Sequence, residues 1–379
     1  MAATLALKSS VLVCRGHRAI NIAYTRKLLW PLAVLLLALV VLRLLLPGWV
    51  HHYLDGRIAR MGTYHGSLSE VNLHIWRGSY TIENLRVEKL GAPASEPFLL
   101  SPRTEITVSF AALLHGRLRG NVDFYDATVN FIDGRTESER QLGKGVNWSN
   151  ELNILIPVEV DRIRVHNGTI TFRNVTSNPR VDLTMNHVQS TVTNLSASKS
   201  ATGERVASLD TTATVLGNAP LETHATFDPA NRFGDFDYHI RVIQIQLVRA
   251  NALARAYTGL DFAGGTGDFS MDLKARNGDL EGYAEPVFKD LKLFSWKKDV
   301  DEDKKGPIKL LYQAAAQGVV SLLKAPSNDQ IVTKVSISGR IGDSQIGGPQ
   351  AIVDVLRHAF AEAYKEQLEH LQPSPNASH

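Results

Sequence analysis

Hydrophobic and polar residues alternate with a period of two over most of the chain, from about residue 64 to residue 295. Each such segment has one apolar and one polar side when extended, which is typical of antiparallel sheets that contact water on one face. Glycines and Asn- or Asp-rich breaks separate the segments and predict turns. Examples of the alternation are Ile106, Val108 and Phe110; Val181, Leu183 and Met185; and Phe236, Tyr238, Ile240 and Val242.

A short phrase recurs inside this region: an apolar pair, a polar residue followed by a small one, and a second apolar pair. The copies are Leu73, Ile75, Arg77-Gly78, Tyr80 and Ile82; Val122, Phe124, Asp126-Ala127, Val129 and Phe131; Ile163, Val165, Asn167-Gly168, Ile170 and Phe172; and a degraded fourth, Leu273, Ala275, Asn277-Gly278 and Leu280. Their spacing is uneven, so the chain has no strict solenoid period.

The apolar parity changes across each polar–small pair, and two local structures explain this. A tight hairpin turn would reverse the chain, and Asn-Gly favours such a turn because it adopts positive φ angles. A bulge would instead keep both apolar pairs on one face of a bent strand. Both alternatives predict a continuous apolar face.

The N-terminal part follows a different pattern. Residues 28–50 are apolar apart from Arg43 and Pro47-Gly48, and this length can span the ~30 Å hydrocarbon layer of a membrane as a helix. Residues 1–27 hold five basic residues and no acidic one, which predicts a cytoplasmic N-terminus. We therefore expect an uncleaved anchor with the remainder of the chain on the far side of the membrane.

The C-terminal part changes character again. Residues 296–306 form a charged link, and Pro307 begins a helical pattern that continues to about Leu323. Ile331, Val335 and Ile337 predict a strand that ends at Gly339, and residues 352–371 predict a second amphipathic helix.

These patterns predict a mainly β protein: a single transmembrane helix followed by a mostly antiparallel sheet with two late α-helices. The expected parts are a cytoplasmic leader (1–27), an anchor (28–50), a β-sheet domain (55–295), a charged link with a helix–strand–helix part (296–372) and a disordered tail (373–379).

Charge and cysteine content narrow the possible functions. The net charge is +3, from 41 basic and 38 acidic residues; residues 1–54 contribute six basic and no acidic ones, so the remainder carries 35 − 38 = −3. Nucleic-acid binding therefore has no support. The single cysteine, Cys14, precedes the predicted anchor, so the body can form no internal disulfide and has no thiol chemistry.

Motifs for catalysis, cofactors or metals are missing from the sequence. There is no G-x-S-x-G, H-E-x-x-H or P-loop pattern, and we interpret Gly264–Gly267 as a loop between strands. His166 and His239 are expected on exposed strand faces, and the Asp235/Asp237 pair in turns. The Asn-x-Ser/Thr sites at Asn147, Asn167, Asn174, Asn194 and Asn376 are glycan acceptors or, as we favour, turn asparagines followed by strand residues.

Taken together, the leader, the anchor and the repeated strand phrase resemble AsmA-like proteins of the Gram-negative envelope. The stretch from Gly116-Arg117-Leu118 to Phe131-Ile132-Asp133 is similar to a phrase that recurs in that family. The tail, with Ser338-Gly339 and residues 355–360, resembles a branch that carries a domain of unknown function.

The resemblance implies an inner-membrane protein whose body projects into the periplasm. It also implies that the sheet is elongated and groove-like, with an apolar β groove, and that the protein has a role in phospholipid transport or outer-membrane integrity, without catalysis. The residues expected to line such a groove are Phe124, Val129, Phe131, Val165, Ile170 and Phe172.

Two other interpretations remain open. The same alternation also fits an ordinary closed core. A structural or regulatory envelope scaffold could instead bind protein partners, or copies of itself, through exposed strand edges or the C-terminal helix. The chain is also short for its resemblance, because a body of about 325 residues is small for bridging two membranes alone.

Overall fold

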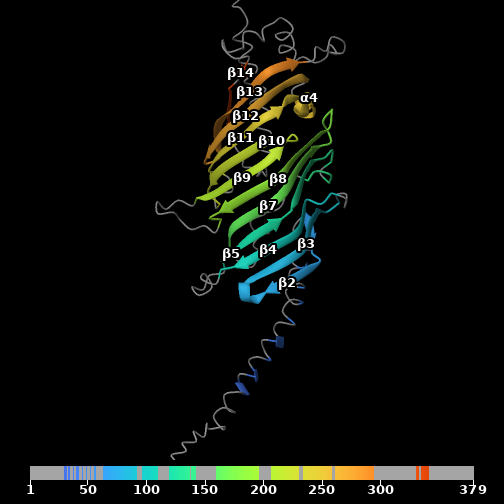
Figure 1. Ribbon diagram of the computed structural model, residues 1–379, viewed down its shortest axis with the longest axis vertical. Helices are drawn as coiled ribbons and strands as arrows, with labels where there is room; N and C mark the ends of the chain where they lie inside the picture. Colours follow the sequence, from blue (N-terminus) through green and yellow to red (C-terminus); the bar gives the residue numbers. More distant parts are fainter. Residues whose placement is uncertain are drawn as a thin grey trace, which may run out of the picture. The chain divides into compact units, whose positions relative to one another are not determined.

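The computed structural model describes residues 63–91, 96–109, 119–136, 138–141, 159–195, 206–229, 234–257, 261–293, 330–332 and 334–340, with isolated positions between 30 and 56. The chain divides into two compact units, Met1–Trp49 and Val50–His379. In the second unit, the described strands lie side by side in one large sheet (Figure 1).

This sheet contains fifteen strands among the described residues. They are β1 (Tyr64–Ser67), β2 (Glu70–His74), β3 (Ser79–Lys89), β4 (Leu99–Val108), β5 (Arg119–Tyr125), β6 (Thr128–Asp133), β7 (Glu159–Asn174), β8 (Val181–Thr193), β9 (Ala207–Val215), β10 (Ala219–Phe227), β11 (Phe236–Gln246), β12 (Phe262–Arg276), β13 (Asp279–Leu293), β14 (Gln330–Val332) and β15 (Val335–Arg340).

Neighbouring strands follow the order β1-β3-β4-β5-β7-β8-β9-β10-β11-β12-β13-β14. Off this path, β2 pairs with β3, β15 pairs with β13, and β6 pairs with both β4 and β7. All pairs are antiparallel except β5 with β7 and β6 with β7, which are parallel. Short strands lie at both ends of the sheet, which leaves little open edge for another chain to pair with.

The core lies on one face of this sheet. A single row of register partners crosses twelve strands, and every member is apolar, aromatic or glycine, as period-two alternation requires. This apolar row is Leu73, Tyr80, Ile106, Val122, Ile163, Val192, Leu209, Ala225, Tyr238, Leu273, Gly282 and Ile337. Burial raises the pKa of Tyr80 and of Tyr238 above the ordinary value for tyrosine.

Two of the repeated phrases form turns. In the first copy, β2 and β3 pair antiparallel and a 3-10 turn, η1 (Ile75–Arg77), joins them, with Gly78 at φ 60°. In the degraded copy, Asn277-Gly278 is the two-residue turn between β12 and β13, with φ angles of 53° and 84°.

The other two copies form bulges. Both halves of the second copy, β5 and β6, run parallel to the same strand β7, so the chain does not reverse at Asp126. That residue and Asn167 of the third copy have φ angles of 53° and 55°. Similar positive angles occur inside other strands, at Asn84, His187 and Gln244.

A short helical segment between β11 and β12 was not predicted from the alternation. The 3-10 turn η2 (Leu247–Ala250) leads into α4 (Asn251–Tyr257). The side chain of Asn251 accepts a hydrogen bond from the Phe262 amide at 2.8 Å and donates one to the Phe262 carbonyl at 2.9 Å. These two bonds join the start of the helix to the start of β12.

The mainly β fold and the large, mostly antiparallel sheet are confirmed, and the described strands begin at Tyr64, where the alternation predicted them. The predicted strand near Ile331 is in fact two strands, β14 and β15. The helices predicted over 307–323 and 352–371 lie outside the described residues.

Most of the predicted anchor, residues 28–50, also lies outside the described residues. The positions described between Trp30 and Gly48 are helical. Among the described residues, no helix has both the length and the apolar character needed to cross a membrane.

Candidate functional site

The apolar face is unevenly buried: Ile106, Val122, Leu273 and Ile337 of the apolar row are at most 2% exposed, whereas the six candidate lining residues are half-buried. The described strands pack against their hydrogen-bonded neighbours in the sheet; of the helical segments, α4 and η2 contact β8, β11 and β12. Leu247 of η2 lies 3.0 Å from the position that a Cβ on Gly267 would take. This small helical unit therefore packs closely where β12 has no side chain.

The six candidate lining residues form three cross-strand pairs. Phe124 pairs with Val165, Val129 with Ile170, and Phe131 with Phe172. The first member of each pair lies on β5 or β6 and the second on β7. The second and third copies of the repeated phrase thus lie side by side in register.

None of the six side chains is fully buried or fully exposed. Phe124, Val129 and Phe131 pack against the core cluster of β1–β7, and Ile170 packs against the cluster that includes Val188 and Leu221. The rings of Phe131 and Phe98 meet edge to face, with centroids 5.7 Å apart. Part of each candidate side chain consequently remains available to a ligand.

The paired bulges keep these residues on one face. Asp126 and Asn167 lie side by side, and the Asn167 amide donates a hydrogen bond of 2.6 Å to the Asp126 carboxylate. Each bulge shifts the side-chain parity by one residue, so the apolar residues before and after it lie on the same face. A bulge also bends its strand, and bulges in neighbouring strands bend the sheet along a common line.

A second row of register partners runs through the middle pair of candidates. It crosses seven neighbouring strands from β3 to β10 and consists of Val87, Leu99, Val129, Ile170, Met185, Val215 and Ala219. Strands lie ~4.8 Å apart, so the six intervals cover roughly 29 Å. One leaflet of a bilayer has an apolar thickness of about 15 Å, and this row is therefore long enough for an acyl chain.

Side chains at the two ends of this row are more deeply buried than those in its middle. Val87, Val215 and Ala219 are buried, whereas Leu99, Val129, Ile170 and Met185 are half-buried. Sequence reasoning missed Leu99 and included Met185 only as part of a strand, because neither lies in the repeated phrase.

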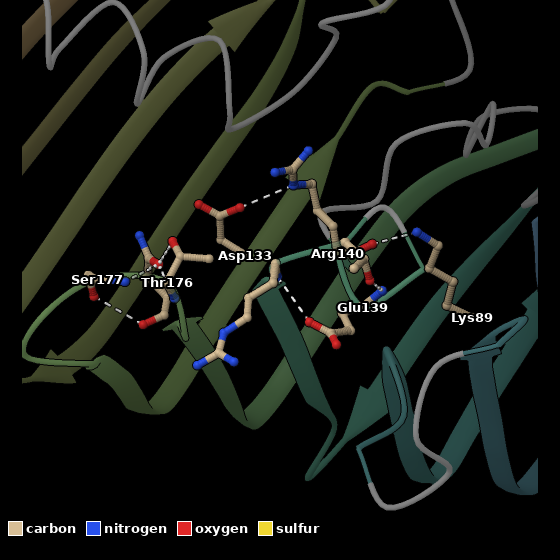
Figure 2. A network of polar contacts seen from close by, with 9 residues as sticks. Lys89, Asp133, Glu139, Arg140, Thr176 and Ser177 are labelled. Carbon is tan, nitrogen blue, oxygen red and sulfur yellow. Dashed lines mark hydrogen bonds and ion pairs between the residues drawn. The ribbon is translucent and has the colours of Figure 1, made fainter.

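Polar contacts hold the ends of β6 and β7, close to Phe131 and Phe172 in the sequence (Figure 2). The Asp133 carboxylate at the end of β6 accepts a hydrogen bond of 3.1 Å from Arg140 Nε, and Lys89 Nζ donates one of 2.5 Å to the Arg140 carbonyl. At the end of β7, the Asn174 carboxamide oxygen accepts the backbone N–H groups of Thr176 and Ser177 at 2.9 and 3.0 Å. The strands that carry Phe131 and Phe172 are therefore held at this end.

On the opposite face, the same strands carry paired charges. Asp123 is buried and lies 2.6 Å from Arg164 Nε and 2.9 Å from His166 Nε2. The His166 ring stacks on the Tyr125 ring, with centroids 4.7 Å apart. The guanidinium carbon of Arg103 lies 4.8 Å from the centroid of the same Tyr125 ring. His166 thus has a structural partner, and the two faces of the sheet differ strongly in polarity.

Two further expectations can be compared with the structure. The interpretation of Gly264–Gly267 as a loop is wrong, because these residues belong to β12, where the pairing with β13 shifts register and Gly265 has φ 106°. Asp235 precedes β11 and accepts a hydrogen bond from the Asn277 amide at 2.7 Å. The expectation of a turn is wrong for Asp237, which lies within β11 and pairs with Arg276 at 2.8 Å.

No family model matches this chain, and no curated protein matches it.

Proposed function

We propose that this protein is an inner-membrane-anchored envelope protein that binds phospholipid acyl chains on the apolar face of its sheet. In this proposal the body lies in the periplasm and contributes to phospholipid transport or outer-membrane integrity without catalysing a reaction. The single observation that carries it is the continuous apolar face, in which four neighbouring half-buried side chains, from Leu99 to Met185, cover roughly 14 Å across the strands.

Acyl-chain binding requires only apolar surface. Each methylene group removed from water gains about 0.8 kcal/mol, so a chain laid along Leu99, Val129, Ile170 and Met185 would be held without a specific polar contact. The sheet supplies these side chains at regular spacing, and the bulges keep them on one face. Lipid movement along such a face needs no catalytic residue.

The proposed anchor is supported by the N-terminal sequence and by exposure. Trp30, Leu37 and Leu45 are 74%, 64% and 67% exposed, and a helix with such side chains on its surface suits a lipid environment. The basic leader before residue 28 favours a cytoplasmic N-terminus. The resemblance to AsmA-like proteins agrees with this placement.

Phe172 is the best position at which to test lipid binding. It is half-buried and lies two residues beyond Ile170 on the same face of β7, so an aspartate there would place a charge beside the proposed acyl path. Ile132 is the matched control, because it lies next to Phe131 on β6 and therefore on the opposite face. Phe172→Asp should lose co-purifying phospholipid, and Ile132→Asp should keep it.

The measurement is native mass spectrometry with lipid extraction on the full chain, purified from membranes in a detergent that contains no phospholipid. Circular dichroism confirms that both variants are folded. A wild-type protein without bound lipid, or equal lipid in the two variants, would contradict the proposal and favour a scaffold that binds protein partners.

A further inference from the structure

Four titratable side chains form one row on the polar face of the sheet, on the opposite side from the apolar row. Asp210 on β9 pairs with His224 on β10, which pairs with His239 on β11, which pairs with Asp272 on β12. The two histidines are therefore direct cross-strand neighbours, and an aspartate flanks each of them on the outer side.

Each aspartate holds its histidine through the same ring nitrogen. His224 Nδ1 lies 2.7 Å from Asp210 Oδ1, and His239 Nδ1 lies 2.8 Å from Asp272 Oδ1. The two nitrogens of an imidazole point in roughly opposite directions. A ring whose Nδ1 faces the outer aspartate therefore presents its Nε2 toward the middle of the row, where the other histidine lies.

The aspartates do more than position the rings, because each carboxylate contacts the ring nitrogen that faces away from the other histidine. An ionised carboxylate on Nδ1 fixes the tautomer of the ring and makes Nε2 a better electron-pair donor. This is the arrangement that orients histidines which bind metals.

The spacing of the two histidines also suits a metal ion. Directly opposed residues in an antiparallel pair have Cβ atoms roughly 4.5–5.5 Å apart, and a zinc ion holds each imidazole nitrogen at about 2.0–2.1 Å. Both side chains are accessible, at 56% for His224 and 48% for His239, so an ion can enter from solvent without opening the sheet.

We propose that His224 and His239 bind one zinc ion through their Nε2 atoms, with Asp210 and Asp272 holding the two rings. Across the described part of the chain, no group of three or more His, Cys, Asp or Glu side chains is placed to hold a metal. In this proposal the ion has two protein ligands, and water fills the remaining coordination positions. It lies on the opposite face from the proposed lipid site and does not depend on it.

Isothermal titration of the full chain with zinc chloride tests the proposal. The protein carries an affinity tag other than polyhistidine and is first treated with a chelator. The wild-type chain should bind one equivalent of zinc that is lost in both His224→Gln and His239→Gln. Asp272→Asn should weaken this binding by about 10- to 100-fold, because the ring is no longer held by a carboxylate.

His187→Gln is the matched control. His187 is an exposed histidine on the neighbouring strand β8, and it contacts Thr214 rather than a carboxylate. Its replacement should leave the titration unchanged. Zinc binding that is absent from the wild type, or equal in the wild type and the two histidine variants, would overturn the proposal.

A spectroscopic measurement covers the case in which a variant fails to fold. Copper(II) also favours imidazole ligands, and its electron paramagnetic resonance spectrum counts the coordinating nitrogens. One equivalent of copper on the wild-type chain should show two nitrogen ligands. A spectrum with fewer than two nitrogens would contradict the site without reference to any variant.

Discussion

Replacing Gly282 with alanine should be strongly destabilising, although it adds only one carbon atom. Gly282 lies on β13 and pairs with Leu273 of β12. A Cβ built on it would lie 2.0 Å from the Asp272 carbonyl oxygen and 2.9 Å from Leu273 Cα. Both neighbours are backbone atoms, so the clash cannot be relieved by rotating a side chain.

The free-energy cost of Gly282→Ala follows from the strand movement that the added Cβ requires. The two strands must separate locally, which strains the packing by roughly 1–3 kcal/mol and weakens at least one ladder hydrogen bond worth about 0.5–1.5 kcal/mol. We therefore expect the free energy of unfolding to fall by about 2–4 kcal/mol. Gly264→Ala is the control, since its Cβ would lie 3.6 Å from Lys292 Cδ, an ordinary contact. That change should be neutral or stabilise by up to about 1 kcal/mol.

Hydrogen–deuterium exchange together with urea denaturation measures the effects of Gly282→Ala and Gly264→Ala on stability. Because the strands pack mainly on their neighbours, the damage should be local. Peptides from β12 and β13 should exchange faster in Gly282→Ala, while those from β3 and β4 should be unchanged. Equal exchange and equal urea midpoints for the two alanine variants would refute the register of this strand pair.

Two further predictions concern Asp268 and the bulge at Asn167. Burial would raise the pKa of Asp268, but hydrogen bonds from Lys289 and the Gln244 amide lower it below the ordinary 3.8. The stabilisation is therefore complete above pH 3.8 and is lost as the pH falls through the lowered pKa. Asp268→Asn should lower stability at pH 7 and reduce the difference between pH 7 and pH 3 in urea denaturation; an unchanged difference would contradict this. Asn167 has φ 55°, so Asn167→Val should cost at least about 1–2 kcal/mol in thermal unfolding, whereas Asn167→Gly should cost clearly less; equal melting temperatures would rule out the bulge.

The alternation alone predicted the strands and the identity of the apolar face, because a period of two depends only on local sequence. It could not predict the partners of those strands. Phe124 and Val165 are 41 positions apart, and their parallel pairing depends on a connection that no local pattern describes.

The repeated phrase shows again that local sequence does not determine which strands pair. Arg77-Gly78 forms a turn and Asp126-Ala127 forms a bulge, although the surrounding spacing is the same. The difference lies in the neighbours: β4 and β7 pair with both halves of the second copy and hold it extended. Non-local pairing decided between two structures that the sequence left open.

The row from Asp210 to Asp272 was missed for a related reason. His239 alone is an exposed strand histidine, and His224 lies fifteen positions earlier in the chain. They meet only because β9 to β12 pair in a register that aligns all four residues. Two histidines on consecutive predicted strands, each with an aspartate on the next strand out, would be the signal to search for.

The central claim, that the apolar face holds acyl chains, is tested most directly by photo-crosslinking in intact membranes. A benzophenone side chain replaces Phe172 in one variant and Tyr125 in another, because both sites are aromatic, half-buried and on opposite faces. Position 172 should crosslink to phospholipid, and position 125 should give few such crosslinks. Equal lipid crosslinking from both positions, or none from position 172, would contradict it.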